Sequence, residues 1–299
     1  MGLFGDDIFA RSHPGLALAY FACVIGITMV VASPVFAGIS LVGAALAALT
    51  TRGRAALPGL GASVVLVVFV TAVNPLFNTA GSTVLLQVFG RPYTAEALLF
   101  GAVLAAQLAA ALLWFSAAGR ALTPEKATYL FGGAAPALSA VLTLVVRLVP
   151  AYGRRARAVA EARDAMGCGP ASAHGMVGKA RAGATVLAAL TAWSLEQGVT
   201  TADSLAARGF GTGRRTVWGR YRLTVRAGLA MAALVALLAL VGVGLAAGAG
   251  GAQFLPQVAL PAASPLVVAA WAAWAAFVIA PTFVGAGEEA LWRCLLSTR

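Results

Sequence analysis

Two short arginine motifs stand out among the residues that could carry chemistry. Ala162-Arg163-Asp164 and Ala207-Arg208-Gly209 place their arginines 45 residues apart, each at the end of a segment predicted to be helical. A guanidinium group stays charged and can bind several carbonyls or a carboxylate at once. If such a group is buried in a groove of a partner protein, truncating it should cost several kcal/mol. The alternative is that both are ordinary interfacial charges whose stems lie along lipid.

The sequence contains only parts of the motifs that ATP hydrolysis or intramembrane proteolysis would need. Lys179 lies in the segment GMVGKAR, which lacks the first glycine and the Ser or Thr of a P-loop. Glu288 and Arg293 belong to an EExxxR pattern that resembles the first motif of CAAX-type intramembrane proteases. The histidine motifs of that family follow this pattern, and no histidine follows His174 here. Paired carboxylates without a later base or metal ligand are poorly equipped to activate water. We expect a protein that is not an enzyme.

Cysteine spacing indicates neither a disulfide framework nor a metal centre. Cys23, Cys168 and Cys294 are far apart and form no CxxC pair. We expect isolated thiols packed as small hydrophobic residues, with no bound metal or cofactor.

Composition indicates an all-α integral membrane protein. Of the 299 residues, 61% are hydrophobic and only 10% are charged. A helix needs about 20 apolar residues to cross the hydrocarbon core, where its backbone groups must be paired internally. We predict about six spans, and counts of five or seven also fit. The predicted spans are Leu16–Ala32, Val35–Leu49, Leu60–Val73, Thr94–Ala118, Ala227–Ala247 and Leu266–Val284.

Positive charge predicts the orientation of these spans. Fifteen of the 21 Lys and Arg residues, but only five of the 10 Asp and Glu residues, lie between Arg120 and Arg226. Because basic loops stay cytoplasmic, this region is expected inside the cell. With six spans, both termini and a short basic loop at Thr51–Arg54 are then also inside. Only Arg91, in a mixed loop over Asn74–Tyr93, faces outward.

The basic region, residues 120–222, is predicted to be a cytoplasmic domain between two membrane regions, 1–119 and 223–299. Leu138, Leu142, Val145 and Val149 recur at helical spacing, and Pro150 is expected to end this helix. Amphipathic helices with basic faces lie on a membrane or against a partner.

Two further helices are predicted in this domain. One runs from near Ala151 to Met166 and stops at the breaker cluster Gly-Cys-Gly-Pro, residues 167–170. The other runs from about Ala171 through Ala206 to an end at Gly209, with a break at Gly198 as an option.

From about His13 to Ala230 the chain resembles the transmembrane T component of energy-coupling factor (ECF) transporters, which are ABC-type importers of vitamins and metal ions. The two arginine motifs, in order on a basic domain between spans, are the most specific part of this resemblance. It also includes Asn74-Pro75-Leu76-Phe77 followed by Gly81, the run Leu122-Thr123-Pro124, and the Arg147-Leu148-Val149-Pro150 segment.

The resemblance implies an assembly with two ABC ATPase subunits and a membrane-embedded substrate-binding S component. In that family the coupling-helix arginines insert into grooves of the ATPases, and motion passes to the S component. Arg163 and Arg208 match those positions, with Ala162, Asp164, Ala207 and Gly209 beside them. Secondary candidates in the coupling domain are Arg147, Pro150, Arg214 and Arg215.

One position departs from the family pattern. Glycine usually follows the motif arginine, whereas residue 164 is aspartate. We expect Asp164 either to pair with Arg163 and restrict its reach, or to form its own bond to the ATPase, so the match is closer at Arg208.

The resemblance implies a multi-pass protein of a bacterial or archaeal cell membrane. An ATP-independent channel or secondary transporter is the main alternative, but such proteins place ionisable groups inside their spans, and here only Glu96 lies near a span end. We expect no nucleic-acid binding, because the basic domain lacks an aromatic–basic platform and faces anionic lipid.

Overall fold

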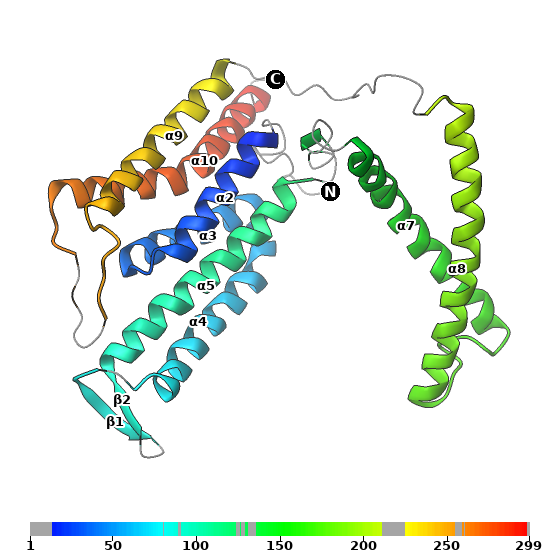
Figure 1. Cartoon of the computed structure of the whole chain (residues 1–299), viewed down its shortest axis with the longest axis horizontal. Helices are drawn as coiled ribbons and strands as arrows, with labels where there is room; N and C mark the ends of the chain where they lie inside the picture. The colour runs from blue at the N-terminus through cyan, green and yellow to red at the C-terminus, as the bar shows by residue number, and fades with distance from the viewer. Residues whose placement is uncertain are drawn as a thin grey trace. The chain divides into compact units, whose positions relative to one another are not determined.

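A computed structural model describes residues 14–79, 81–88, 91–123, 126, 129–130, 136–210, 225–254, 259 and 261–297. The chain forms two compact units (Figure 1). The bundle unit comprises Met1–Thr123 and Tyr221–Arg299, so both ends of the chain contribute to it. The hairpin unit comprises Pro124–Arg220, which holds most of the basic residues.

Helices make up nearly all of the described bundle unit. They are α2 (Pro14–Val30), α3 (Pro34–Arg52), the 3-10 turn η1 (Gly53–Ala56), α4 (Leu57–Phe77), α5 (Ala95–Ala121), α9 (Val225–Ala246) and α10 (Pro265–Ser297). A small antiparallel hairpin of β1 (Val84–Val88) and β2 (Arg91–Thr94) joins α4 to α5. The chain is thus essentially all-α, as predicted from its sequence.

Two predicted loops of the bundle unit are wrong in part. The segment Thr51–Arg54 is not a loop, because α3 continues to Arg52 and η1 follows directly. Helix α4 likewise includes Pro75 and ends only at Phe77, and part of the expected loop over Asn74–Tyr93 is the β-hairpin. Helix α10 also runs past the predicted end at Val284 to Ser297.

Apolar character is strong enough in this unit for membrane insertion. In the part of the chain that the structure describes, Pro34–Phe77, Ala95–Ala121 and Gly228–Ala246 are long and apolar enough to cross a membrane. Pro14–Val30 and Pro265–Ala280 are shorter apolar helices. On α4, Val64, Val65, Val68 and Phe69 are all more than 60% exposed, a surface that suits lipid rather than water. These features are those of an integral membrane protein.

Aromatic side chains and close helix approaches form the core. Trp114, Trp274 and Phe36 are almost fully buried. The Tyr20 hydroxyl donates to the carbonyl of Val278 over 3.1 Å, tying α2 to α10. Gly43 lies so close to Val278 that a Cβ at residue 43 would overlap its side chain. Small residues at such crossings allow helices to approach closely, as is usual inside a membrane.

A buried polar network links α2, α3 and α5. The hydroxyls of Thr28 and Ser40 lie 2.6 Å apart, and the Trp114 indole N–H donates to Ser40 over 3.2 Å. The Gln107 amide nitrogen donates to the carbonyls of Thr28 and Val31 over 2.9 and 2.8 Å. Since Gln107 satisfies carbonyls at the end of α2, where the helix leaves them without partners, the network fixes the α2–α3 turn against α5.

Contacts also establish the directions of these helices. The start of α5 meets the end of α4, where Asn74 faces Gly101, whereas the end of α5 meets the end of α3, where Arg120 donates to Thr51 over 3.3 Å. Thus α4 runs antiparallel to α5 and α3 parallel to it. Arg52, Arg54 and Arg120 therefore gather at one end of the bundle unit, the same end at which the chain leaves α5 for the hairpin unit.

Two long helices form the described core of the hairpin unit, α7 (Pro136–Ala165) and α8 (Gly175–Ala207). Pro150 does not end the first helix as predicted; α7 passes through it, so the two helices expected before Gly167 are one. Residues on both sides of Pro150 share one face toward α8, since Leu144, Leu148 and Tyr152 line the cavity beside it and Tyr152 stacks on Trp193. Helix α8 begins at Gly175 rather than Ala171 and is unbroken at Gly198.

Candidate functional site: the two helix ends of the hairpin unit

Aromatic and apolar contacts hold α7 and α8 together as an antiparallel pair. Tyr152 and Trp193 stack edge to face with ring centroids 5.3 Å apart, and the Arg155 guanidinium lies 5.7 Å above the Trp193 ring. A Tyr–Trp pair and a cation over indole each contribute about 0.5–1.5 kcal/mol beyond burial. These contacts fix the register of two helices that carry the predicted arginine motifs.

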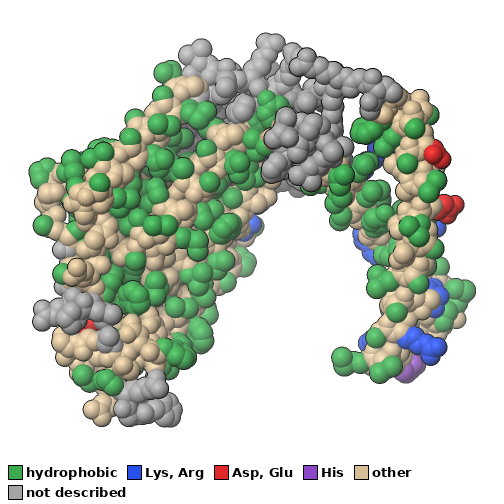
Figure 2. All heavy atoms as spheres, in the orientation of Figure 1, with side chains coloured by type: hydrophobic (Ala, Val, Ile, Leu, Met, Phe, Trp, Pro, Cys, Tyr) green, Lys and Arg blue, Asp and Glu red, His purple; other side chains and the backbone are tan. Residues whose placement is uncertain are grey.

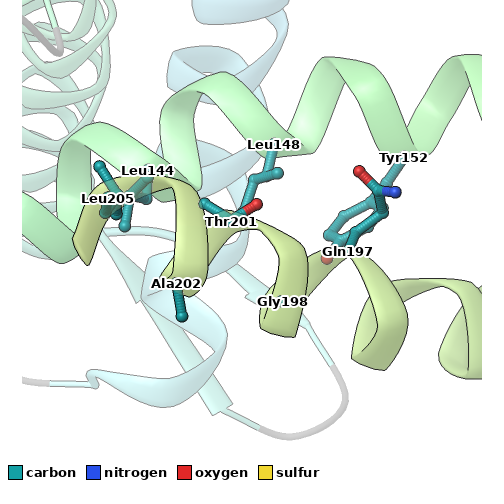
Figure 3. A pocket seen from close by; sticks show the side chains of 8 residues that line it. All are labelled: Leu144, Leu148, Tyr152, Gln197, Gly198, Thr201, Ala202 and Leu205. Atoms are coloured by element: carbon teal, nitrogen blue, oxygen red, sulfur yellow. The ribbon is translucent and has the colours of Figure 1, made fainter. Parts of the chain in front are cut away.

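A small cavity of about 200 Å³ lies between the two helices (Figure 3). It is lined by Leu144, Leu148, Tyr152, Gln197, Gly198, Thr201, Ala202 and Leu205. The lining holds no carboxylate, histidine, lysine or arginine, so it offers no group for acid–base catalysis at neutral pH or for metal binding. The arginine motifs predicted from the sequence lie away from this cavity, at the ends of the two helices.

Helix α7 ends in a rigid Schellman cap. Gly167 adopts φ +74°, its N–H donates to the Asp164 carbonyl over 2.9 Å, and the Cys168 N–H donates to the Arg163 carbonyl over 3.0 Å. Glycine occupies this position because left-handed backbone is costly for residues with a Cβ. The breaker cluster predicted from the sequence is thus a defined stop.

The side chain of Asp164 organises the turn after α7. Its Oδ1 accepts hydrogen bonds from the N–H groups of Ala171 and Ser172 over 2.8 and 3.1 Å. Gly169 packs directly against Asp164, and a Cβ at residue 169 would overlap both the Asp164 backbone nitrogen and its carboxylate. Of the two roles expected for this aspartate, pairing with Arg163 is replaced by bonding to the turn backbone.

Arg163 is turned back toward its own helix end. Its Nη2 donates to the Cys168 carbonyl over 3.3 Å, and its Nε is enclosed with no hydrogen-bond partner in the described part of the chain. A basic side chain in the last turn opposes the negative end of the helix dipole, and its bond to the Cys168 carbonyl ties the helix end to the turn that follows it. This geometry gives Arg163 a structural role at the junction of α7 and the turn after it.

Arg208 has a different setting at the end of α8. It is the C-cap residue of this helix, and its side chain is exposed. Gly209 follows with φ +71°, its N–H donates to Ala206 over 2.9 Å, and the Phe210 N–H donates to Leu205 over 3.0 Å. Arg208 and Phe210, which is 57% exposed, therefore project from a fixed helix end.

The remaining predicted residues are spread over the same unit. Ala162 and Ala207 are exposed in the last turns of α7 and α8, and Arg147 and Pro150 are exposed farther back along α7. Arg214 and Arg215 lie outside the described residues. Gly169 belongs to the breaker cluster predicted from the sequence, whereas Ser172 was not predicted as part of the turn, although the density of small residues after Asp164 was a usable signal of it.

Both helices also carry exposed apolar stripes. Val141, Val145 and Val149 follow one another at every fourth residue of α7, and they are 46–61% exposed. Leu187, Leu195 and Val199 are 64–69% exposed on α8. Figure 2 shows such hydrophobic side chains between the basic ones along this pair of helices. A protein partner or the membrane interface would remove these stripes from water.

Possible metal ligands and the EExxxR pattern are the remaining features of the chain to be placed. Across the described residues, no group of three or more His, Cys, Asp or Glu side chains could hold a metal ion. Glu288, Glu289 and Arg293 fall within α10, and their side chains lie outside the described part. Comparison with protein-family models and with curated proteins gives no match for this chain.

Proposed function

We propose that this chain is the T component of an ECF-type ABC importer. It would act as a membrane-embedded scaffold that transmits the ATP-driven motion of two ATPase subunits to an S component, for uptake of a vitamin or a transition-metal ion. In this proposal the chain crosses the cell membrane about six times, with both termini and the hairpin unit on the cytoplasmic side.

The exposed guanidinium of Arg208 is the observation that carries the proposal. It stands at the end of a 33-residue helix whose last turn is closed by the Gly209 cap. A rigid helix with a charged tip can transmit a displacement, because little of the motion is absorbed by bending at the tip. The five donors of arginine suit a partner groove that offers carbonyls or a carboxylate.

The design of the bundle unit supports the same assignment. Arg52, Arg54 and Arg120 lie at the end from which the chain passes to the basic hairpin unit. This distribution of charge agrees with that end being cytoplasmic, where soluble ATPases are found. The exposed stripes of α7 and α8 supply apolar area for contact with an S component.

Affinity purification of the tagged protein from its native membranes tests the proposal. We expect P-loop ATPase subunits and a small membrane protein to co-purify with the wild type, and the complex to hydrolyse ATP. Arg208→Ala should lower the retained ATPase by about tenfold or more, since removing a buried charged anchor at an interface costs at least 2 kcal/mol.

Arg181→Ala is the matched control, because Arg181 is an exposed arginine of the same helix and lies far from the C-terminal end that carries Arg208. Its ATPase content should equal that of the wild type. Absence of any ATPase from the wild-type complex, or full retention by Arg208→Ala, would contradict the proposed function.

A further inference from the structure

The ends of α7 and α8 have the same cap geometry, but Arg163 and Arg208 do not occupy equivalent positions in the two caps. Gly167 and Gly209 have φ values of +74° and +71°. The N–H after each glycine donates over 3.0 Å to the carbonyl five residues earlier, which belongs to Arg163 in α7 and to Leu205 in α8. Superposing the caps therefore matches Arg163 with Leu205.

Met166 is then the structural counterpart of Arg208. Each is the residue directly before the left-handed glycine of its cap. The sequences around them agree, since Ala-Met-Gly-Cys-Gly at 165–169 corresponds to Ala-Arg-Gly-Phe-Gly at 207–211. The first arginine motif, three residues before Met166, stands almost one helical turn away from this position.

Exposure distinguishes Met166 from Arg163 as a contact residue. The Met166 side chain is 70% exposed, whereas Arg163 is only partly exposed and is bonded to the Cys168 carbonyl. Met176 and Val177, in the first turn of α8 after the connecting turn, are 90% and 84% exposed. Three large apolar side chains thus lie in and beside the α7–α8 turn, and water is a poor environment for them.

We propose that Met166, rather than Arg163, makes the contact of the α7 end with an ATPase subunit, by inserting its thioether side chain into an apolar groove. The inference rests on the proposed function, which supplies the ATPase as the partner. The flexible, polarisable methionine side chain suits such a groove. The hairpin unit would then hold one ATPase subunit through an apolar tip and the other through the cationic tip at Arg208.

Four variants of the full-length complex test this assignment by retained ATPase content. Met166→Ala should reduce it by about tenfold, as expected for an interface anchor, whereas Met166→Leu should keep it within about twofold because volume and polarity are conserved. Arg163→Ala should also stay within about twofold while speeding hydrogen exchange at the end of α7. Arg208→Ala reports on the proposed function in the same experiment.

Site-specific photocrosslinking provides a second measurement that does not depend on the stability of a truncated variant. A benzophenone amino acid at residue 166 should yield an adduct with an ATPase subunit, and one at residue 154, an exposed position of α7, should not. Suppose that Arg208→Ala loses ATPase, but Met166→Ala retains it and the probe at residue 166 forms no adduct with an ATPase subunit. Only the Met166 assignment is then overturned. If Arg208→Ala has no effect, the proposed function fails and this inference fails with it.

Discussion

Single residues decide the shape of the turn between α7 and α8. Asp164 anchors this turn through hydrogen bonds to residues seven and eight positions later, and Gly169 must come close to its backbone. The sequence predicted the stop itself, because glycine and proline cluster there. It could not predict the role of Asp164, since that role depends on how the turn folds back.

Gly169→Ala should destabilise this turn. The added methyl group would overlap backbone atoms of Asp164, which cannot move aside as a side chain could, so we expect a loss of about 1–3 kcal/mol. Hydrogen exchange at the Ala171 and Ser172 amides, both bonded to Asp164, should become faster. Gly183→Ala is the matched control, since open space surrounds residue 183 within α8 and alanine there should stabilise the helix by about 0.5–1 kcal/mol.

Equal exchange rates in Gly169→Ala and the wild type would contradict the close approach between residue 169 and Asp164.

The residue scale also shows why two arginines with similar neighbours differ. Arg163 and Arg208 follow alanine in both motifs, yet one lies in the last turn before its cap and the other within it. The second motif includes its cap glycine, Gly209, whereas the first motif ends three residues before its own, Gly167.

At the scale of elements, Pro150 is the clearest difference between expectation and structure. A proline inside a helix removes one hydrogen bond and costs about 3 kcal/mol, which is why the sequence predicted a helix end there. Leu148 and Tyr152, on either side of Pro150, line the same cavity beside α8, and Tyr152 stacks on Trp193, so tertiary packing favours a continuous helix here. Tertiary contacts overrode the local helix propensity, and a short stretch of sequence cannot reveal such contacts. The apolar spans, by contrast, were predictable because length and hydropathy suffice.

Pro150→Ala should strengthen the middle of α7. The restored N–H can donate to the carbonyl of residue 146, so hydrogen exchange between residues 146 and 154 should slow by an amount corresponding to as much as about 3 kcal/mol. Gly153→Ala is the control for helix propensity alone, since residue 153 is exposed with open space around it, and its gain should be about 0.5–1 kcal/mol. Equal gains in the two variants would mean that Pro150 costs the helix no more than a glycine.

At the scale of the whole molecule, the directions of the helices bring the basic residues of the bundle unit to one end of it. The alternation of α3, α4 and α5 places Arg52, Arg54 and Arg120 at the end where the chain leaves for the hairpin unit, and the β1–β2 hairpin at the opposite end. The sequence predicted this division from basic residues alone. It could not predict the contacts that join α10 to α2 and α3, because Tyr20 and Val278 are 258 residues apart.

Thiol labelling of intact cells tests the orientation. In a protein freed of its other cysteines, Gln87→Cys places an exposed thiol in β1, and native Cys168 supplies one in the turn after α7. A membrane-impermeant maleimide should modify residue 87 in intact cells but reach Cys168 only after permeabilisation, because the basic hairpin unit would face the cytoplasm. Since both side chains are exposed, a difference in labelling reports the side of the membrane rather than burial. The reverse pattern would place the hairpin unit outside the cell, beyond the reach of any cytoplasmic ATPase, and equal labelling of both sites in intact cells would be incompatible with a bilayer between them.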